Sequence, residues 1–302
     1  MDGYPSLAQR ILLQNIVLAT DFSASSLSAV HYATSIANHY GGKVYVVHVI
    51  TPEVSQRVPP ETNHEFEKSI RAEAERQMKA VLESKDLQSV PHEGVLKNGE
   101  VWDALHEFLF ERHIHLIVTG TRGRRGLRKL IMGSVAEEIF RLSPVPVLTA
   151  RPDVRRRDPD FRTILYPIDF STDSVRAMAY ALSLAQEFQS RVVFLHVAPI
   201  SGDDPGVRLR LREFFSGQLR QIIPPETSSW CQQELVVEFG SPAEAICKSA
   251  DIYNADLIIM GVRGAGSLAR ASTHIGSTAY QVVSEARAPV LSVRQIQQDL
   301  LK

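Results

Sequence analysis

The stretch GTRGRRGLRKLIMGS, residues 120–134, decides the fold, together with the apolar run at 116–119 directly before it. That run is typical of a short buried strand, and residues 135–140 have the pattern of the first turns of a helix. Glycines let a backbone approach an oxyanion closely, and the unpaired N–H groups of a helix start point toward it. Because the loop holds five Arg and Lys residues and no acidic one, it predicts a phosphate site.

The spacing of the glycines excludes two common kinds of phosphate site. Gly120, Gly123 and Gly133-Ser134 form the pattern G-x2-G-x9-G-S. It contains no Gly-Lys-Ser/Thr, so it is not a P-loop, and its spacing is not that of a dinucleotide fingerprint. The alternative is a flexible surface turn rich in glycine and arginine. The strand before the loop and the helix after it favour the phosphate site.

The chain is an internal repeat. IVLATDFS at 16–23 returns as ILYPIDFS at 164–171, and LIVTG at 116–120 returns as LIIMG at 257–261. Self-similarity at fixed offsets indicates a tandem duplication. We expect one domain over 1–151, a linker over 152–160 that is rich in charge and proline, and a second domain over 161–297.

Each copy alternates apolar strands with helices. In the first copy we expect strands at 16–21, 43–50, 90–97, 115–119 and 145–150, and helices at 24–40, 61–84, 100–112 and 134–142. Strands that are nearly continuous in Val, Ile and Leu predict a parallel sheet covered on both faces, which is an α/β fold. Ligands of such sheets bind beyond the carboxyl ends of the strands, where the strand order reverses.

Composition excludes several functional classes. The chain has 302 residues, of which 44% are hydrophobic and 22% charged, and its formal net charge is −1. Nothing in this balance suggests bulk binding to nucleic acid or to a membrane. We expect neither a signal peptide nor a membrane span. With only two cysteines, Cys231 and Cys247, the sequence favours the reducing cytoplasm.

Three features together resemble the universal stress protein family: the Asp-Phe-Ser strand end, the His48-Val49 strand, and the glycine motif after a strand. The resemblance covers both halves of the chain. It implies two tandem five-stranded parallel domains of nucleotide-binding, Rossmann-like type. The branch of the family that binds ATP carries this glycine motif, so the implied ligand is ATP, with or without Mg²⁺.

The resemblance also implies roles for individual residues of the first copy. The adenine and ribose would be lined by Ala19, Thr20, Asp21 and Val49. The ribose and phosphates would be held by Thr119, Gly120, Gly123, Gly133, Ser134 and Val135. A carboxylate such as Asp21 would repel phosphates but can accept a hydrogen bond from a base amino group or a ribose hydroxyl. Helix capping is the alternative role for Asp21, and the two roles can coexist.

The second copy departs from the motif. The matching positions are Pro167, Ile168, Asp169, Val197, Met260, Gly261, Gly264, Gly276 and Ser277. His274 stands where the third glycine is expected, and Gly276-Ser277 follows two residues late. The loop also has only two Arg residues and no Lys. We therefore predict weaker or absent nucleotide binding in the second copy.

The remaining candidates are weaker. His48 and His196 lie inside apolar strands, so we expect them to be packed and hydrogen-bonded rather than catalytic or metal-bound. The sequence offers no metal-binding spacing and no nucleophile elbow. Slow ATP hydrolysis and a nucleotide-free interaction module remain alternatives to an ATP-binding regulatory or stress-response protein. By the same resemblance, the last strands of the two copies would pair as a pseudo-dimer within one chain, and two chains could associate further with each other or with a protein partner.

Overall fold

A computed structural model describes residues 11–52, 60–121, 132–152, 160–199, 204–262 and 276–294. The chain forms two compact units, one over Leu12–Pro152 and one that contains the chain from Asp153 onward. We call them the first and second domain and describe each by itself. The predicted α/β fold with parallel sheets is confirmed. The predicted domain bounds and linker stay predictions, since most of the linker lies outside the described residues.

The first domain is a parallel sheet with strand order β3-β2-β1-β4-β5. Its strands are β1 (Asn15–Ala19), β2 (Lys43–Ile50), β3 (His92–Asn98), β4 (Leu116–Gly120) and β5 (Val147–Ala150). Its helices are α1 (Ala24–Leu27), α2 (Val30–Tyr40), α3 (Pro60–Leu82), the short 3-10 helix η2 (Leu87–Ser89), α4 (Val101–Glu111) and α5 (Ser134–Leu142).

The second domain repeats this topology with strand order β10-β9-β6-β7-β8. Its strands are β6 (Thr163–Pro167), β7 (Arg191–Ala198), β8 (Gln233–Phe239), β9 (Leu257–Gly261) and β10 (Val290–Val293). Its helices are α6 (Thr172–Phe188), α7 (Pro205–Ile222), the 3-10 helix η3 (Pro225–Ser229), α8 (Pro242–Ile252) and α9 (Ser277–Glu285). The structure thus bears out the internal repeat.

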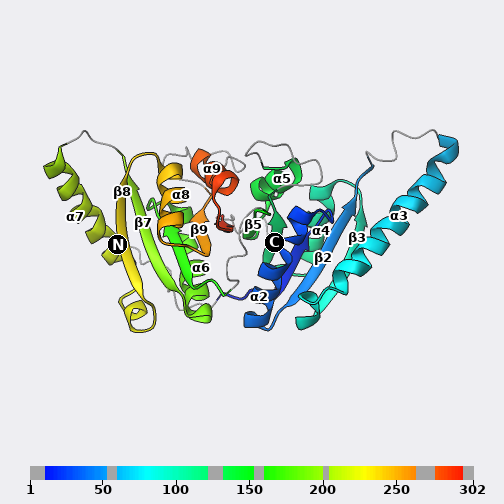
Figure 1. Cartoon of the computed structure of the whole chain (residues 1–302), viewed down its shortest axis with the longest axis horizontal. Coiled ribbons are helices and arrows are strands. Elements are labelled where there is room, and N and C mark those ends of the chain that lie inside the picture. Colours follow the sequence, from blue (N-terminus) through cyan, green and yellow to red (C-terminus); the bar gives the residue numbers. More distant parts are fainter. Residues whose placement is uncertain are drawn as a thin grey trace. The chain divides into compact units, whose positions relative to one another are not determined.

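Helices cover the sheet of each domain, as Figure 1 shows. In the first domain one core cluster joins Val17 and Tyr45 of the sheet to Leu105 and Phe108 of α4 and to Ile139 of α5. The alternate strand residues, such as Ile16 and Val44, are also fully buried, so both faces are covered. Among the described helices none is long and apolar enough to cross a membrane.

One predicted helix is wrong in detail. Residues 24–40 form two helices, α1 and α2, whereas the matching segment of the second domain is the single helix α6. The break follows a run of serines, and the Ser28 hydroxyl donates to the carbonyl oxygen of Ser25 at 2.6 Å. Hydroxyls that bond nearby backbone carbonyls compete with the helix ladder and bend helices. The serine run therefore explains why the two copies differ here.

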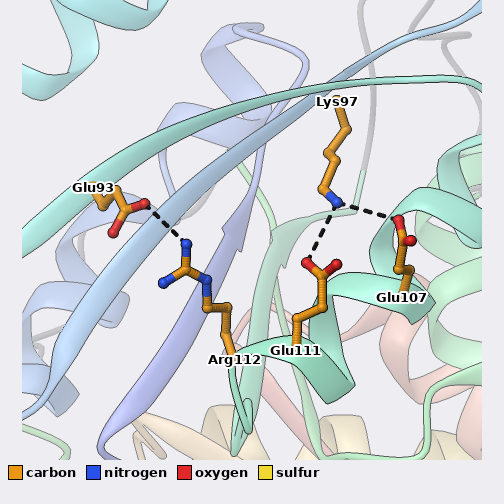
Figure 2. Close-up of polar contacts among 5 residues, drawn as sticks. All are labelled: Glu93, Lys97, Glu107, Glu111 and Arg112. Atoms are coloured by element: carbon orange, nitrogen blue, oxygen red, sulfur yellow. Dashed lines mark hydrogen bonds and ion pairs between the residues drawn. The ribbon is translucent and has the colours of Figure 1, made fainter.

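Charged side chains join the edge strand β3 to α4 (Figure 2). Lys97 Nζ lies 3.2 Å from a Glu107 oxygen and 3.5 Å from a Glu111 oxygen, and Arg112 reaches Glu93 at 3.6 Å. Partial desolvation opposes the charge on Lys97, but the attraction of the two carboxylates outweighs it, so the pKa of Lys97 is raised. Because these groups are partly exposed, each pair is worth at most about 1 kcal/mol.

Candidate nucleotide-binding site

In the first domain the strand order reverses between β1 and β4, so the candidate crevice lies at their carboxyl ends. Ala19, the last residue of β1, is in register with Thr119 of β4. Thr20 and Asp21 therefore leave the sheet beside Thr119 and Gly120. Ala19, Thr20 and Thr119 are buried, whereas Asp21 is half-buried. Val49 near the end of β2 is also half-buried.

Asp21 lies in the turn before α1, whose N-cap is Ser23; the Ser23 hydroxyl accepts from the Ser26 amide at 3.2 Å. Asp21 Oδ1 accepts from the Ser23 amide at 3.0 Å and from the Ser26 hydroxyl at 2.8 Å. The Thr20 hydroxyl lies 2.9 Å from the Ser26 hydroxyl and accepts from the Phe22 amide at 2.9 Å. The alternative role of helix capping therefore belongs to Ser23 rather than to Asp21. The two hydrogen bonds of Asp21 fix its carboxylate at the crevice and are compatible with contact to a ligand.

Backbone hydrogen bonds join the two ends of the glycine loop. The Thr121 N–H donates to the carbonyl oxygen of Ala150 in β5 at 2.9 Å, and the Gly133 N–H donates to the carbonyl oxygen of Thr121 at 2.9 Å. The two ends of the motif are therefore adjacent at the end of β4. Gly123 and the loop's Arg and Lys residues lie outside the described residues, so their predicted contacts stay predictions.

The helix after the loop begins without a side-chain cap. Gly133 is the N-cap of α5 in extended conformation (φ −66°, ψ 150°) and supplies no capping hydrogen bond. Ser134 is exposed, and so is 43% of Val135. The first amides of a helix have no intrahelical partner, and the helix dipole favours an anion there. The start of α5 is thus suited to a phosphate group.

Packing within the domain by itself requires a glycine at position 120. A Cβ atom at this position would lie 2.6 Å from the Ser25 carbonyl oxygen and 2.9 Å from Ser26 Cα. Gly261 in the second domain stands in the same relation to the backbone of Asp173 and Ser174. The first glycine of the motif therefore lets the helix after the first strand pack against the end of β4 or β9.

Thr121 is a candidate that the motif did not single out. It is only 3% exposed, and its hydroxyl oxygen makes no hydrogen bond within the described chain. A buried polar group without a partner costs about 1–3 kcal/mol, so it calls for an explanation such as a ligand or an ordered water. From sequence, the signal was the contrast with Val262, which occupies the matching position of the second copy.

In the second domain the matching residues lie at the same positions of the fold, but several of them are apolar where the first domain has hydroxyl groups. Ile168 and Val262 stand where the first domain has Thr20 and Thr121, and both are buried. Pro167 and Met260 are buried, Gly261, Gly276 and Val197 are half-buried, and Asp169 and Ser277 are exposed. Gly264 and His274 lie outside the described residues. This crevice edge therefore presents fewer hydroxyl groups than the first domain's.

The two strand histidines are packed and hydrogen-bonded, as predicted. His48 Nδ1 lies 2.8 Å from the Thr20 carbonyl, and His196 Nδ1 lies 2.8 Å from the Ile168 carbonyl. The rings of Phe22 and Phe170 lie against them at 4.4 and 4.9 Å. Within the described residues no group of three His, Cys, Asp or Glu side chains is arranged to hold a metal ion.

Both phenylalanines have a left-handed backbone that sequence reasoning missed. φ is 60° at Phe22 and 59° at Phe170, directly after Asp21 and Asp169 and before the N-cap serines of α1 and α6. Such a conformation costs a bulky residue free energy and persists where the surroundings fix it. The turn from strand to helix is therefore fixed in the same way in both domains.

The stability of the second domain should depend on His196 in mildly acidic solution. Burial lowers the pKa of His196 from its ordinary 6.5, although the Ile168 carbonyl and Asp169 oppose this. As the pH falls, His196 therefore binds a proton more readily in the unfolded chain than in the folded chain. We expect stability to fall as pH decreases through about 6.5 toward the lower folded pKa.

Fluorescence of Trp230 during urea denaturation, in a Trp102→Phe background, measures this dependence for the second domain. His196→Gln should flatten the stability profile between neutral and mildly acidic pH, while His39→Gln on an exposed position should leave it unchanged. An unaltered profile in His196→Gln would mean that another group causes the loss.

The fold and its crevice define a duplicated parallel α/β protein with a candidate ligand site at the strand ends. The family model described as the universal stress protein family matches residues 13–151 and again 160–294. The chain therefore belongs to the universal stress protein family, as a member with two tandem domains.

Individual relatives agree with this assignment. A universal stress protein of Thermus aquaticus is 35% identical over 139 residues, which are 44% of this chain and 99% of that protein. One of Mycobacterium tuberculosis is 24% identical over 316 residues and is matched over 94% of this chain and 96% of its own length. A universal stress protein structure from Archaeoglobus fulgidus superposes with a TM-score of 0.62 at 23% identity, over 93% of this chain and 98% of that one. This last likeness concerns the fold alone.

Proposed function

We propose that this universal stress protein binds ATP in its first domain and acts as a regulatory protein in a stress response. The bound nucleotide would bias a conformation or a contact with a protein partner. Its proposed setting is the cytoplasm. The second domain would bind nucleotide weakly or not at all, and would support the first domain or a partner contact.

The crevice supplies groups for each part of the nucleotide. Asp21 is held at the crevice by Ser23 and Ser26 and would accept a hydrogen bond from the adenine amino group or a ribose hydroxyl. Gly133 and the first amides of α5 would receive the phosphates. The remaining predicted contacts, through Ala19, Thr20, Val49, Thr119, Gly120, Gly123, Ser134 and Val135, belong to the same proposal, and Mg²⁺ could accompany the phosphates.

The difference between the two crevices is the observation that carries the proposal. The first domain buries the hydroxyl groups of Thr20 and Thr121 at the strand ends, where the second domain has Ile168 and Val262. The Thr121 hydroxyl has no partner in the described chain. Burying an unpaired hydroxyl costs free energy that a ligand contact would offset. The polar version of the site is thus in the copy whose glycine motif is complete.

Calorimetric titration of the purified full chain with ATP tests the proposal. We expect one ATP per chain. Mass spectrometry of ligand released from the protein would identify a nucleotide that copurifies. Two ATP of equal affinity would contradict the assignment to the first domain, and no binding would overturn the proposal. Timed ADP production, with a Gly133 variant as the control, distinguishes binding from the alternative of slow hydrolysis.

Thr121→Val separates a ligand role from a structural one. The change replaces an unpaired buried hydroxyl by a methyl group of similar shape, as in the second domain. We expect the first domain to keep or gain stability, by up to about 1 kcal/mol, and its ATP affinity to fall about tenfold.

Thr34→Val is the matched control, because Thr34 is equally buried but its hydroxyl donates to the His31 carbonyl at 3.1 Å. It should lower stability and leave ATP affinity unchanged. If Thr121→Val binds ATP as tightly as the wild type, the hydroxyl has no part in the site.

A further inference from the structure

The helix α7 differs in charge from α3, its counterpart in the first domain. Residues 64–82 of α3 carry four Arg and Lys and four Glu residues, with ion pairs such as Arg76–Glu73 at 2.7 Å and Arg71–Glu75 at 3.1 Å. In contrast, α7 carries four arginines and a single Glu, residue 213. The surface of α3 is therefore neutralised by its own residues, whereas α7 has a net positive charge.

Two arginines of α7 form no ion pair with the described acidic residues. Neither Arg210 nor Arg212 forms an ion pair with an acidic residue of the described chain, and both are exposed. Arg212 instead lies over the ring of Phe239 at the end of β8, 5.8 Å from its centroid. The ring attracts the Arg212 guanidinium group and leaves its charge available to a partner.

An exposed aromatic ring lies on the same helix. Phe214 is 57% exposed, and its ring meets that of Phe215 edge-on at 5.2 Å. Phe215 in turn lies 4.2 Å from the buried ring of His196. A phenylalanine side chain has only two rotatable bonds and loses little entropy when a partner covers it, and aromatic residues are enriched at protein interfaces.

The ring belongs to an apolar stripe. Val207 and Leu211 precede Phe214 at helical spacing and are half-buried. The helix packs on β7 and β8 of its own domain, and Figure 1 shows it beside β8 at the edge of that sheet. The strand after each helix, β3 or β8, begins at residue 92 or 233, which is an offset of 141. At this offset Val207 and Leu211 match Phe66 and Ile70 of α3, whereas Phe214 matches Glu73. The exposed phenylalanine at the end of the stripe is thus a property of the second copy alone.

We propose that α7 is a docking surface for an acidic amphipathic segment of a partner protein. Apolar side chains of that segment would cover Phe214 and the stripe, and its carboxylates would pair with Arg210 and Arg212. Charge complementarity selects an acidic partner, and the i, i+4, i+7 spacing of the stripe suits a helix. The surface is independent of the nucleotide site, because it lies on the domain with the altered motif.

Fluorescence anisotropy with a synthetic peptide tests this surface on the full chain. The probe is a labelled amphipathic helix of about 18 residues, with Leu on one face and Glu on the other. The comparison peptide has Lys in place of every Glu. We expect the acidic peptide to bind at least tenfold more tightly than the basic one, and its affinity to fall as salt is added.

Variants locate the binding. Phe214→Ser and the double variant Arg210→Glu/Arg212→Glu should each weaken acidic-peptide binding at least tenfold. Arg71→Glu/Arg76→Glu on α3 makes the same charge change on the other copy and should alter binding less than twofold. Circular dichroism of each variant checks that it is folded, and ATP titration should be unchanged in all of them.

Three outcomes would overturn the proposal. The first is equal binding of the acidic and basic peptides. The second is wild-type affinity in both α7 variants. The third is binding to phosphatidylglycerol vesicles or single-stranded DNA that the α7 variants abolish while the acidic peptide does not bind, which would make α7 a membrane or nucleic-acid surface instead.

Discussion

Ser134→Glu is expected to lower the affinity for ATP about 100-fold while the first domain stays at least as stable as the wild type. The residue is exposed and is the first residue of α5, so a larger side chain disturbs no packing. A carboxylate at a helix start interacts favourably with the dipole, by about 0.3–1 kcal/mol. The same carboxylate would repel a phosphate group nearby by about 3 kcal/mol, which corresponds to roughly 100-fold in affinity.

The duplication supplies the control for this variant. Ser277 is likewise exposed and is the first residue of α9 in the second domain. Ser277→Glu should leave the ATP affinity within twofold of the wild type. Calorimetric titration of both variants measures the difference. A large effect in Ser277→Glu with none in Ser134→Glu would move the nucleotide to the second domain, and no effect in either would argue against phosphate at these helix starts.

Gly120→Ala is expected to destabilise the first domain by about 3 kcal/mol. The added Cβ would meet backbone atoms of Ser25 and Ser26 at 2.6–2.9 Å, closer than real contacts allow. Backbone of the packed helix cannot move aside as a flexible side chain can. Urea denaturation in a Trp230→Phe background reads the first domain alone, because Trp102 of α4 is then the chain's remaining tryptophan.

Gly217→Ala is the control for this variant, because the same substitution is expected to stabilise the protein there. Gly217 lies within α7, and a Cβ there would meet nothing within 4 Å. Alanine should therefore stabilise the second domain by about 0.5–1 kcal/mol, which Trp230 fluorescence can report. If Gly120→Ala proved neutral, α1 would have to shift away from β4, and the close approach would not be a constraint on the fold.

The parallel α/β architecture was predictable because its strands are buried on both faces. Runs such as residues 44–47 and 116–118 are uniformly apolar, a pattern that amphipathic edge strands do not share. The break between α1 and α2 was not predictable from apolar spacing, which continues through residues 24–40. It depends on the hydrogen bond from the Ser28 hydroxyl to the Ser25 carbonyl oxygen, which competes with the backbone hydrogen bonds of the helix.

The candidate site was predictable in position but not in its internal hydrogen bonds. The glycine motif and the Asp-Phe-Ser repeat identified the residues that the topology brings to the ends of β1 and β4. Periodicity does not reveal that Asp21 is bonded to Ser23 and Ser26, nor that the Thr121 hydroxyl is unpaired in the described chain. These features depend on side-chain geometry after folding. The roles of the site residues in binding stay predictions.

The pairing of β1 with β4 has a consequence for synthesis of the chain. Ala19 and Thr119 are adjacent in the sheet but a hundred residues apart in sequence. On the ribosome, β1 leaves the exit tunnel soon before β2 but well before β4 exists, and contacts between such distant segments form slowly. The proposed nucleotide site combines the end of β1 with the start of α5, so it is complete only after α5 has been made.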